Sequence, residues 1–314
     1  MINEDHLASL DVAIAVFVYN RPQRTRDLLQ SLGKHLELAD IPIYVYSDGP
    51  KADVEGDAEK VGVVRDACRA FSRIKLVEHP WNIGLAKSIV SGVTQVLEVH
   101  REIIVLEDDL ELASEFFDFM LTMLARYRGH PSVFHISGYM IPTRSRLPDL
   151  GLYRLPGSWG WATWRDKWSY YNHDISVLIE QVRAMGISSF NVDDSFFHFL
   201  TLEENQTGAR ETWAIRWYAS LYLNGGLSVY PHQSFVRNRG FGVDATNCKK
   251  SNKLYRVKLK SGRPFWLDCA LPDGETPSYV EAYKVFHKEL LASWAGHPTF
   301  VQRLRLKLKR LIKS

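Results

Sequence analysis

The segment IIVLEDDLE, residues 103–111, joins a short apolar strand to a cluster of acids. Its first four residues are apolar and three of them are β-branched, which is typical of a strand covered on both faces. Glu107, Asp108 and Asp109 follow at once, and three adjacent carboxylates are costly to bury without partners. Open α/β sheets bind ligands at the carboxyl edge of their strands, where this pattern places the acids.

Two interpretations fit these acids. A hard divalent cation with oxygen ligands would hold them together, and a nucleoside diphosphate could supply its remaining ligands. Alternatively, the acids form a loop in front of a helix that could start at Ser114, with Asp118 in its first turn. The pattern in the rest of the chain favours the first interpretation.

Strand and helix patterns alternate over residues 11–110, which predicts an α/β fold with a mainly parallel sheet flanked by helices. The predicted strands are 12–19, 43–46, 74–78 and 103–106, and the predicted helices are 24–32, 54–71 and 86–100. Polar groups follow three strand ends, at Asn20-Arg21, at Asp48 and at the acids, so they should meet in one crevice. No G-x-G-x-x-G or G-x-x-x-x-G-K-[ST] motif is present, which excludes the Rossmann dinucleotide and P-loop classes.

The segment SWGWATWRDKW, residues 158–168, contains four tryptophans. The last three have helical spacing, which predicts packing in the core. Trp159, Gly160 and Trp161 are expected near the site, where an indole could stack on a sugar ring and the glycine would allow close approach.

Composition narrows the class of protein. The chain has 314 residues and a net charge of +3, too slight to favour nucleic acid as a partner. Three widely spaced cysteines predict neither a disulfide framework nor a zinc cluster, and they favour a reducing compartment. No apolar run approaches the ~20 residues of a membrane helix, and no signal peptide is evident, so a cytoplasmic location is expected. The tail 302–314 carries six positive charges and no acid, which suits either an anionic membrane surface or a solvated end.

Four stretches resemble inverting glycosyltransferases of the GT-A fold: Val18–Pro22, Asp48-Gly49, Leu106–Glu111 and Gly160-Trp161. These stretches resemble N-acetylglucosaminyltransferase I and its bacterial relatives, and more loosely glycosyltransferase family 2. The resemblance implies a GT-A domain over 1–247, with a nucleotide-binding half at 11–110 and an acceptor and catalytic-base half at 111–247. A C-terminal extension at 248–314 would follow.

The resemblance also implies roles for single residues. Asp109 would bind Mn²⁺ or Mg²⁺, and Glu211, shortly before a tryptophan, would be the catalytic base, with Asp193 and Asp194 as alternatives. Arg21 would contact the diphosphate or nucleoside of the donor. The residues expected to bind the donor are Asn20, Arg21, Asp48, Asn82, Lys87, Glu107, Asp108, Trp159, Gly160 and Trp161.

Within the donor-binding set, Asp48 would meet the base, Asp108 the ribose and Glu107 the transferred sugar. The basic loop Arg237–Thr246 could cover an anionic group, with Arg237 or Arg239 on the phosphates, although surface loops often look like this without a function.

The expected function is metal-dependent, inverting transfer of a hexosyl or N-acetylhexosaminyl group from a nucleotide sugar, UDP-linked by expectation. The acceptor would be a glycan or lipid-linked saccharide in surface polysaccharide biosynthesis. One alternative is a sugar nucleotidyltransferase, which would usually carry a glycine-rich basic loop after the first strand, unlike Asn20-Arg21-Pro22-Gln23. Another is a non-catalytic carbohydrate-binding protein, which would leave the acids without a partner.

Overall fold

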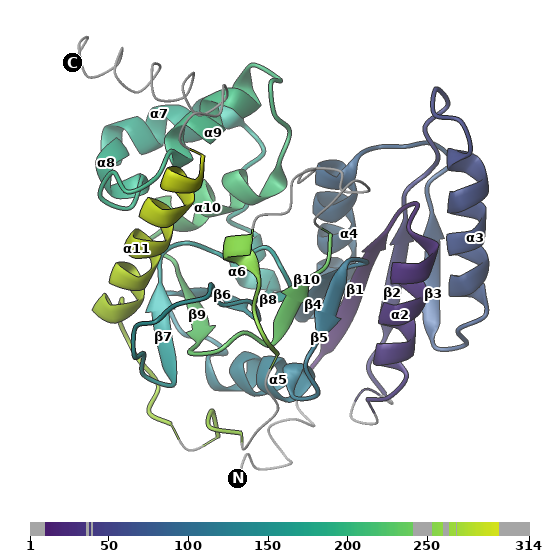
Figure 1. Ribbon diagram of the computed structural model, residues 1–314, viewed down its shortest axis with the longest axis horizontal. Helices are drawn as coiled ribbons and strands as arrows, with labels where there is room; N and C mark the ends of the chain where they lie inside the picture. Colours follow the sequence, from purple (N-terminus) through teal and green to yellow (C-terminus); the bar gives the residue numbers. More distant parts are fainter. Residues whose placement is uncertain are drawn as a thin grey trace.

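A computed structural model describes residues 10–35, 38, 40–240, 253–259, 264–267 and 269–294. An eight-stranded sheet with the order β3-β2-β1-β4-β8-β6-β9-β7 forms its centre, and helices cover both faces (Figure 1). The basic tail and most of the loop Arg237–Thr246 lie outside the described residues. No described helix is long and apolar enough to cross a membrane.

The half of the sheet that carries the acids is parallel. β1 (Val12–Val18) is buried along its whole length and lies between β2 (Ile43–Ser47) and β4 (Glu102–Glu107), with β3 (Ile74–Glu78) outside β2. Phe17 is level with Glu107 and Val18 with Ser47, so these strands end at one edge. The predicted mainly parallel α/β sheet is confirmed, with antiparallel strands added in the second half.

β8 (Trp161–Trp164) adds the first antiparallel strand, between β4 and β6 (Val133–Ser137). β9 (Leu227–Pro231) is parallel to β6, and β7 (Leu150–Tyr153) forms the antiparallel edge. The core packing expected for the last three tryptophans is confirmed, because Trp161, Trp164 and Trp168 are all buried, but the three do not share one helix. Trp161 and Trp164 lie on a strand with both faces covered, so all its residues are buried and no period-2 alternation is visible.

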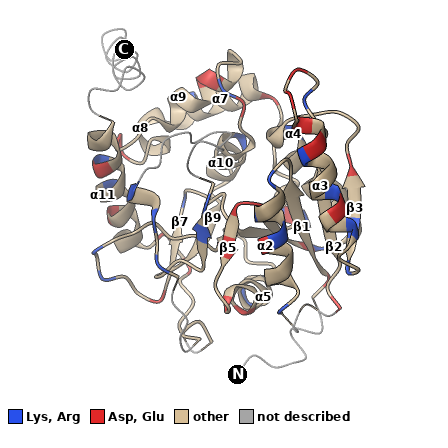
Figure 2. Ribbon diagram, turned by 45° about the vertical axis from the view of Figure 1, so that its right-hand side comes forward, with Lys and Arg blue, Asp and Glu red and all other residues tan. Residues whose placement is uncertain are grey.

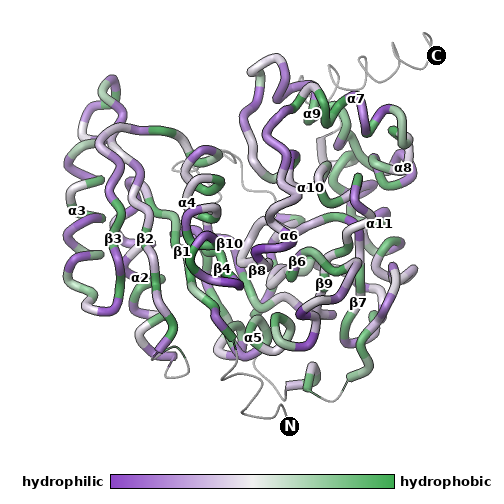
Figure 3. The backbone as a smooth tube through the Cα atoms, turned by 180° about the vertical axis from the view of Figure 1, so that it is seen from behind, coloured by the Kyte–Doolittle hydropathy of each residue, from purple (hydrophilic) through white to green (hydrophobic). Residues whose placement is uncertain are grey.

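The two faces of β1 are covered by different helices. Its even-numbered residues pack against α2 (Pro22–Leu32), α3 (Asp57–Arg69) and α5 (Phe116–Arg126). Its odd-numbered residues pack against α4 (Leu85–Val99) and, further along the sheet, α6 (Arg165–Trp168) and α10 (Trp213–Leu223) cover the same face. β1 is accordingly apolar at the centre of the fold in Figure 3. α7 (Ile175–Met185), α8 (Ile187–Phe190) and α9 (His198–Gln206) form a further layer against α10.

A second, two-stranded sheet lies directly after the acids. β5 (Leu110–Leu112) pairs with β10 (Val236–Asn238), and Asn238 lies opposite Leu110. The backbone N–H of Arg239 donates to the carbonyl oxygen of Asp109 at 2.8 Å. This pairing brings a distant part of the chain onto the acid cluster.

The described part of the C-terminal extension belongs to the core. η2 (Lys253–Tyr255) and α11 (Pro277–Ser293) both contribute side chains to the main apolar cluster, and Trp266 between them is buried. The Arg126 guanidinium donates to the carbonyl oxygen of Trp266 at 2.6 Å and to that of Cys269 at 2.9 Å. The extension therefore packs against the first domain, although the boundary at 247 stays a prediction.

Candidate active site

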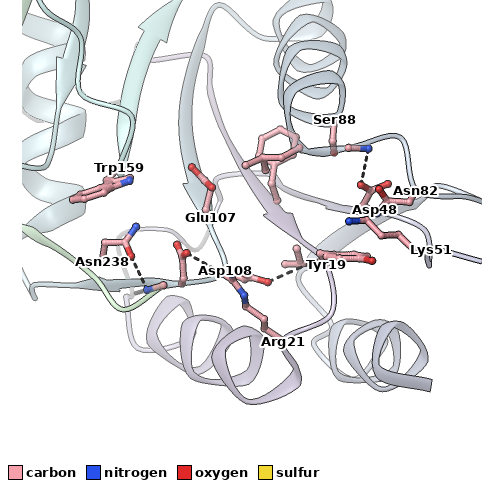
Figure 4. Close-up of a pocket in the computed structure, with 16 residues that line it drawn as sticks. Tyr19, Arg21, Asp48, Lys51, Asn82, Ser88, Glu107, Asp108, Trp159 and Asn238 are labelled. Atoms are coloured by element: carbon pink, nitrogen blue, oxygen red, sulfur yellow. Dashed lines mark hydrogen bonds and ion pairs between the residues drawn. The ribbon is translucent and has the colours of Figure 1, made fainter. Parts of the chain in front are cut away.

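A pocket opens at the carboxyl edge of β1 and β4, where the three groups of polar residues were expected to meet (Figure 4). In this view Trp159 lies on one side, Asp48, Lys51 and Asn82 lie on the other, and the acids with Arg21 lie between them. The lining residues are Phe17, Val18, Tyr19, Arg21, Asp48, Lys51, Asn82, Gly84, Leu85, Ser88, Glu107, Asp108, Asp109, Trp159, Asn238 and Gly240.

Asp108 is buried and turned towards the first strand. Its carboxylate accepts a hydrogen bond from the backbone N–H of Tyr19 at 3.3 Å and faces the Arg21 guanidinium at 3.4 Å. Burial, followed by the charge of Asp109, raises the pKa of Asp108 to about 7. The same two causes, with Asp108 added, raise the pKa of Glu107 well above its usual value. A positive charge bound beside these carboxylates would favour their ionised forms.

The two carboxylate oxygens of Asp109 differ in their contacts. Its Oδ2 lies 2.8 Å from Nη1 of Arg21, whereas its Oδ1 is buried and has no hydrogen-bond partner among the described residues. Although burial opposes it, the charges of Asp108 and Asp109 raise the pKa of Arg21, which keeps this guanidinium charged. Figure 2 shows acidic residues around β5 next to basic residues of α2. In this pocket the Arg21 guanidinium thus faces both Asp108 and Asp109, while Oδ1 of Asp109 has no hydrogen-bond partner among the described residues.

That open oxygen fits a divalent cation. A hard cation such as Mg²⁺ is commonly held by one or two carboxylates together with substrate phosphate oxygens. No cluster of three or more His, Cys, Asp or Glu side chains suited to a metal occurs in the described ranges. Asp109 would therefore be the principal protein ligand, and a phosphate-bearing substrate would have to supply others.

Gly240 closes the pocket over Asp109. A Cβ atom added at residue 240 would lie 2.8 Å from Cγ of Asp109 and closer still to its Oδ2. The backbone N–H of Gly240 donates to Oδ1 of Asn238 at 2.6 Å, which holds the end of β10 in place. Only a glycine allows the chain to pass this close to the carboxylate.

Asp48 organises the opposite wall. Its carboxylate accepts backbone N–H groups from Gly49 and Ile83 at 2.9 Å and from Gly84 at 3.0 Å. The Asn82 amide donates to the carbonyl oxygen of Gly49 at 3.0 Å. These bonds tie the end of β2 to the loop that starts α4. The contact of Asp48 with a base stays a prediction.

A buried carboxylate that the sequence did not single out, Asp57, supports this wall. It accepts hydrogen bonds from the Tyr19 hydroxyl, from Nδ2 of Asn20 at 2.5 Å and from the backbone N–H of Lys51 at 2.8 Å. Although burial works against it, these hydrogen bonds hold the pKa of Asp57 below its usual value. Its position in the first turn of α3, close after an exposed turn, was the only sequence signal.

Several predicted donor-binding residues lie outside the lining. Asn20 is turned towards Asp57, and Lys87 is exposed on α4 while the next residue, Ser88, faces the pocket. Trp161 is buried between the rings of His135 and Trp213, with centroids 5.2 and 5.0 Å away. On the helix and the strand, neighbouring side chains point in different directions, so Ser88 and Trp159 line the pocket where Lys87 and Trp161 do not. Contact of Asn20, Lys87 or Trp161 with a donor stays a prediction.

Gly160 also lies behind the lining, although its expected role as a point of close approach fits its surroundings. Its φ is +60°, and a Cβ there would lie 2.7 Å from Cγ2 of Val236. The glycine thus lets the segment after Trp159 pass directly under β10, and Trp159 itself remains in the pocket wall.

The three candidate bases lie in different surroundings. Glu211 is exposed just before α10, whose first residue Trp213 stacks on Trp161. Asp193 pairs with Nζ of Lys284 at 2.7 Å, and Asp194 accepts from the Ser188 hydroxyl at 2.8 Å. None of the three lines the pocket. Glu211 lies two residues before Trp213, whose ring stacks on Trp161 in the strand next to β4.

The two arginines at the end of β10 have partners in the protein. Both arginines at 237 and 239 reach the Glu111 carboxylate, Arg237 at 2.6 and 2.9 Å and Arg239 at 2.6 Å. Neither lines the pocket. The expected contact of Arg237 or Arg239 with donor phosphates would require these ion pairs to be exchanged.

Comparison with known proteins finds matches among solved structures alone. No protein-family model and no curated sequence matches the chain. Solved structures match at low identity. They include the mannosyltransferase PcManGT from Pyrobaculum calidifontis in complex with GDP-Man and Mn²⁺, at 12% identity, TM-score 0.41, over 68% of this chain and 70% of that one.

Two further solved structures extend this comparison. S. aureus TarS matches at 13% identity, TM-score 0.42, over 72% of this chain and 36% of that one. The 4-diphosphocytidyl-2C-methyl-D-erythritolsynthase from Anaerococcus prevotii DSM 20548 matches at 10% identity, TM-score 0.32, over 58% and 79%. The chain spans about a third of the length of TarS. Each likeness is one of fold over part of the chain, and the fold neighbours include both a sugar transferase and a diphosphocytidyl-compound synthase.

Proposed function

We propose that this chain is a GT-A-type, metal-dependent glycosyltransferase that moves a sugar from a nucleotide-sugar donor, UDP-linked in our proposal, with inversion. The observation that carries the proposal is the Asp109 carboxylate: its buried Oδ1 has no hydrogen-bond partner among the described residues, and its Oδ2 lies 2.8 Å from Nη1 of Arg21. A single open carboxylate oxygen next to a guanidinium suits a cation and diphosphate bound together. A nucleoside diphosphate sugar supplies this diphosphate, and the nucleoside diphosphate is the leaving group when the sugar is transferred.

The pocket residues divide into groups by what they would do. Asp109 would hold Mn²⁺ or Mg²⁺, which when bound supplies Lewis-acid stabilisation to the departing diphosphate. Arg21 would donate charge-assisted hydrogen bonds to the phosphate oxygens. Asp48 and the loop it anchors would receive the nucleoside, and Glu107 would face the transferred sugar.

The catalytic base in this proposal is Glu211. As an acceptor hydroxyl attacks the anomeric carbon on the face opposite the diphosphate, a carboxylate at the head of α10 would take the hydroxyl proton. The stacking of Trp213 on Trp161 supports this position, since Trp161 pairs in the sheet with Val105, two residues before Glu107. One displacement with one base inverts the anomeric configuration. The proposed acceptor is a glycan or lipid-linked saccharide of a surface polysaccharide.

A nucleotidyltransferase would need a longer phosphate-binding loop than this chain offers. β1 ends at Val18 and α2 begins at Pro22, so three residues connect them, and none is glycine. A purely carbohydrate-binding protein would gain nothing from buried acids that raise one another's pKa. Both alternatives therefore account for less of the pocket than sugar transfer does.

Binding of UDP measured by calorimetry, with Mn²⁺ and with excess chelator, tests the proposal. We expect binding to depend on Mn²⁺ and to be lost in Asp109→Asn, which keeps the side-chain shape but removes its charge. A screen of nucleotide sugars for Mn²⁺-dependent hydrolysis then identifies the donor. Equal UDP affinity in chelator and in the variant would overturn the metal-dependent mechanism, and pyrophosphate release from UTP or CTP with a sugar 1-phosphate would favour the nucleotidyltransferase.

A further inference from the structure

A buried carboxylate joins the two loops that border the pocket on the side of Asp48. Asp57 lies in the first turn of α3 and is not itself part of the lining. It accepts hydrogen bonds from the Tyr19 hydroxyl, from Nδ2 of Asn20 at 2.5 Å and from the backbone N–H of Lys51 at 2.8 Å. Tyr19 and Asn20 follow β1, whereas Lys51 follows β2. One side chain thus holds together the connections that follow two neighbouring strands.

Tyr19 is fixed at both of its ends. Its backbone N–H donates to Oδ2 of Asp108 at 3.3 Å, and its hydroxyl donates to Asp57. Burial, followed by the hydrogen bond and the charge of Asp57, raises the pKa of Tyr19 above its usual value, so the hydroxyl keeps the proton that it donates. Tyr19 lines the pocket. Asp57 therefore sets the direction of a side chain that a bound ligand would meet.

These contacts lie to one side of the proposed metal and phosphate groups. In Figure 4 Tyr19 lies between the acids and the side of the pocket that carries Asp48. Arg21 is held separately, because its guanidinium lies 2.8 Å from Oδ2 of Asp109. In the proposed function the nucleoside lies against Asp48 and the diphosphate against Arg21 and Asp109. Loss of the Asp57 contacts should therefore disturb the nucleoside and leave the diphosphate site in place.

A carboxylate in the first turn of a helix can also act through the helix dipole alone. That role needs no partner from another element, whereas two of the three donors to Asp57 come from residues 37 and 38 positions away. Although burial opposes it, the hydrogen bonds, led by that from Tyr19, hold the pKa of Asp57 below its usual value. An uncharged amide at this position could accept fewer of these bonds, because half of its polar group is itself a donor.

We infer that Asp57 is a positioning residue of the nucleoside site, which holds Tyr19 and the loop at Lys51 in the arrangement that receives the nucleoside of the donor. This inference rests on the proposed function. Asp57 lies outside the lining, so its effect on binding has to pass through the residues that it holds. Removing its charge should weaken nucleotide binding, and part of that loss should disappear when the Tyr19 hydroxyl is already absent.

A double-mutant cycle of Asp57→Asn and Tyr19→Phe tests the inference, with UDP affinity measured by calorimetry at saturating Mn²⁺. We expect each single substitution to weaken UDP binding by about tenfold, and the double variant to bind UDP about as well as Asp57→Asn alone. A purely structural role would lower the melting temperature without this coupling in UDP affinity. Asp66→Asn is the matched control, because Asp66 is an exposed residue of the same helix that pairs with Arg69, and UDP affinity should stay unchanged.

UDP binding by the unmodified protein in Mn²⁺ is measured first. Its absence refutes the proposed function, whereas normal UDP binding with unchanged affinity in Asp57→Asn refutes the positioning role alone. Losses that multiply in the double variant would also overturn the inference, since Tyr19 and Asp57 would then act independently. An equal loss in Asp66→Asn would do the same.

A second variant covers the case in which Asp57→Asn has no cooperative melting transition. Asn20→Ala then replaces it in the cycle, because Asn20 donates to the same carboxylate and does not line the pocket. The combined loss with Tyr19→Phe should fall short of the product of the two single losses. Independent losses, or unchanged UDP affinity in Asn20→Ala, would overturn the inference.

Discussion

Gly240→Ala should impair the proposed metal site without destabilising the fold. A Cβ at this position would lie 2.8 Å from Cγ of Asp109 and closer to Oδ2, against an ordinary contact of about 3.5–4.0 Å. The carboxylate or the end of β10 must therefore move by roughly 1 Å, and a displacement of that size costs about 10²-fold in rate. The φ of Gly240 is not positive, so an alanine backbone is allowed there and the effect is steric.

The assay is Mn²⁺-dependent UDP binding by calorimetry, followed by donor hydrolysis, with thermal melting in parallel. We expect UDP affinity and hydrolysis to fall by about 10²-fold, or ~2.7 kcal/mol, while the melting temperature changes little. Gly62→Ala is the matched control, because a Cβ at Gly62 would meet no atom within 4 Å and the residue lies inside α3, where alanine is favoured. Unchanged Mn²⁺-dependent UDP binding in both Gly240→Ala and Asp109→Asn would refute the assignment of Asp109 as the metal ligand.

Glu211→Gln should lower kcat by about 10²–10⁴-fold without weakening Mn²⁺-dependent UDP binding, because only the acceptor proton depends on this base. In EDTA, the melting temperature should fall as the pH rises through about 7, since burial and Asp109 raise the pKa of Asp108 to about 7 and its ionisation is then unfavourable in the folded state. Arg126→Ala should lower the free energy of unfolding by about 1–3 kcal/mol, because two carbonyl oxygens of the C-terminal extension, at 2.6 and 2.9 Å, lose their donor.

Each of these outcomes has a control. Asp193→Asn should leave kcat unchanged, and a loss equal to that of Glu211→Gln would contradict the choice of base. An acid whose pKa is higher in the folded state than in the unfolded state stabilises the fold below its unfolded-state pKa. This contribution is lost as the pH rises through the folded-state pKa. Asp108→Asn should therefore make the melting temperature depend less on pH. Arg183→Ala, at an exposed ion pair, should change stability by less than about 1 kcal/mol, and an equal loss there would remove the special role of Arg126.

Buried parallel strands were predictable because each carries its own signature. β1, β2 and β4 contain short buried apolar runs bounded by turn residues, whereas β3 is a partly exposed edge strand, and the order of the strands along the chain implied that their ends share an edge. The acids after β4 and Asp48 after β2 therefore met in one pocket, as expected. β8 escaped prediction because Trp161 packs on one face of the sheet and Trp164 on the other, so burial erased the alternation that marks a strand.

The pocket's second half could not be predicted in the same way. β5 and β10 are three residues each, too short for any periodicity, and their partners Glu111 and Arg237 are 126 positions apart. The contribution of Asp57 depends on a hydrogen bond from Tyr19, which lies in the connection between β1 and α2. No local pattern marks either feature, since both exist only when separate elements are packed together.

By itself, the sequence determined that a parallel sheet would present three acids at its carboxyl edge, because apolar runs and turn residues act locally. Only the tertiary structure decided what each acid does. Asp108 is turned to the backbone of Tyr19, whereas Asp109 keeps one buried oxygen without a described partner under Gly240. That distinction depends on which residues from distant parts of the chain contact each carboxylate oxygen. Contacts of this kind produce no periodic pattern in the sequence.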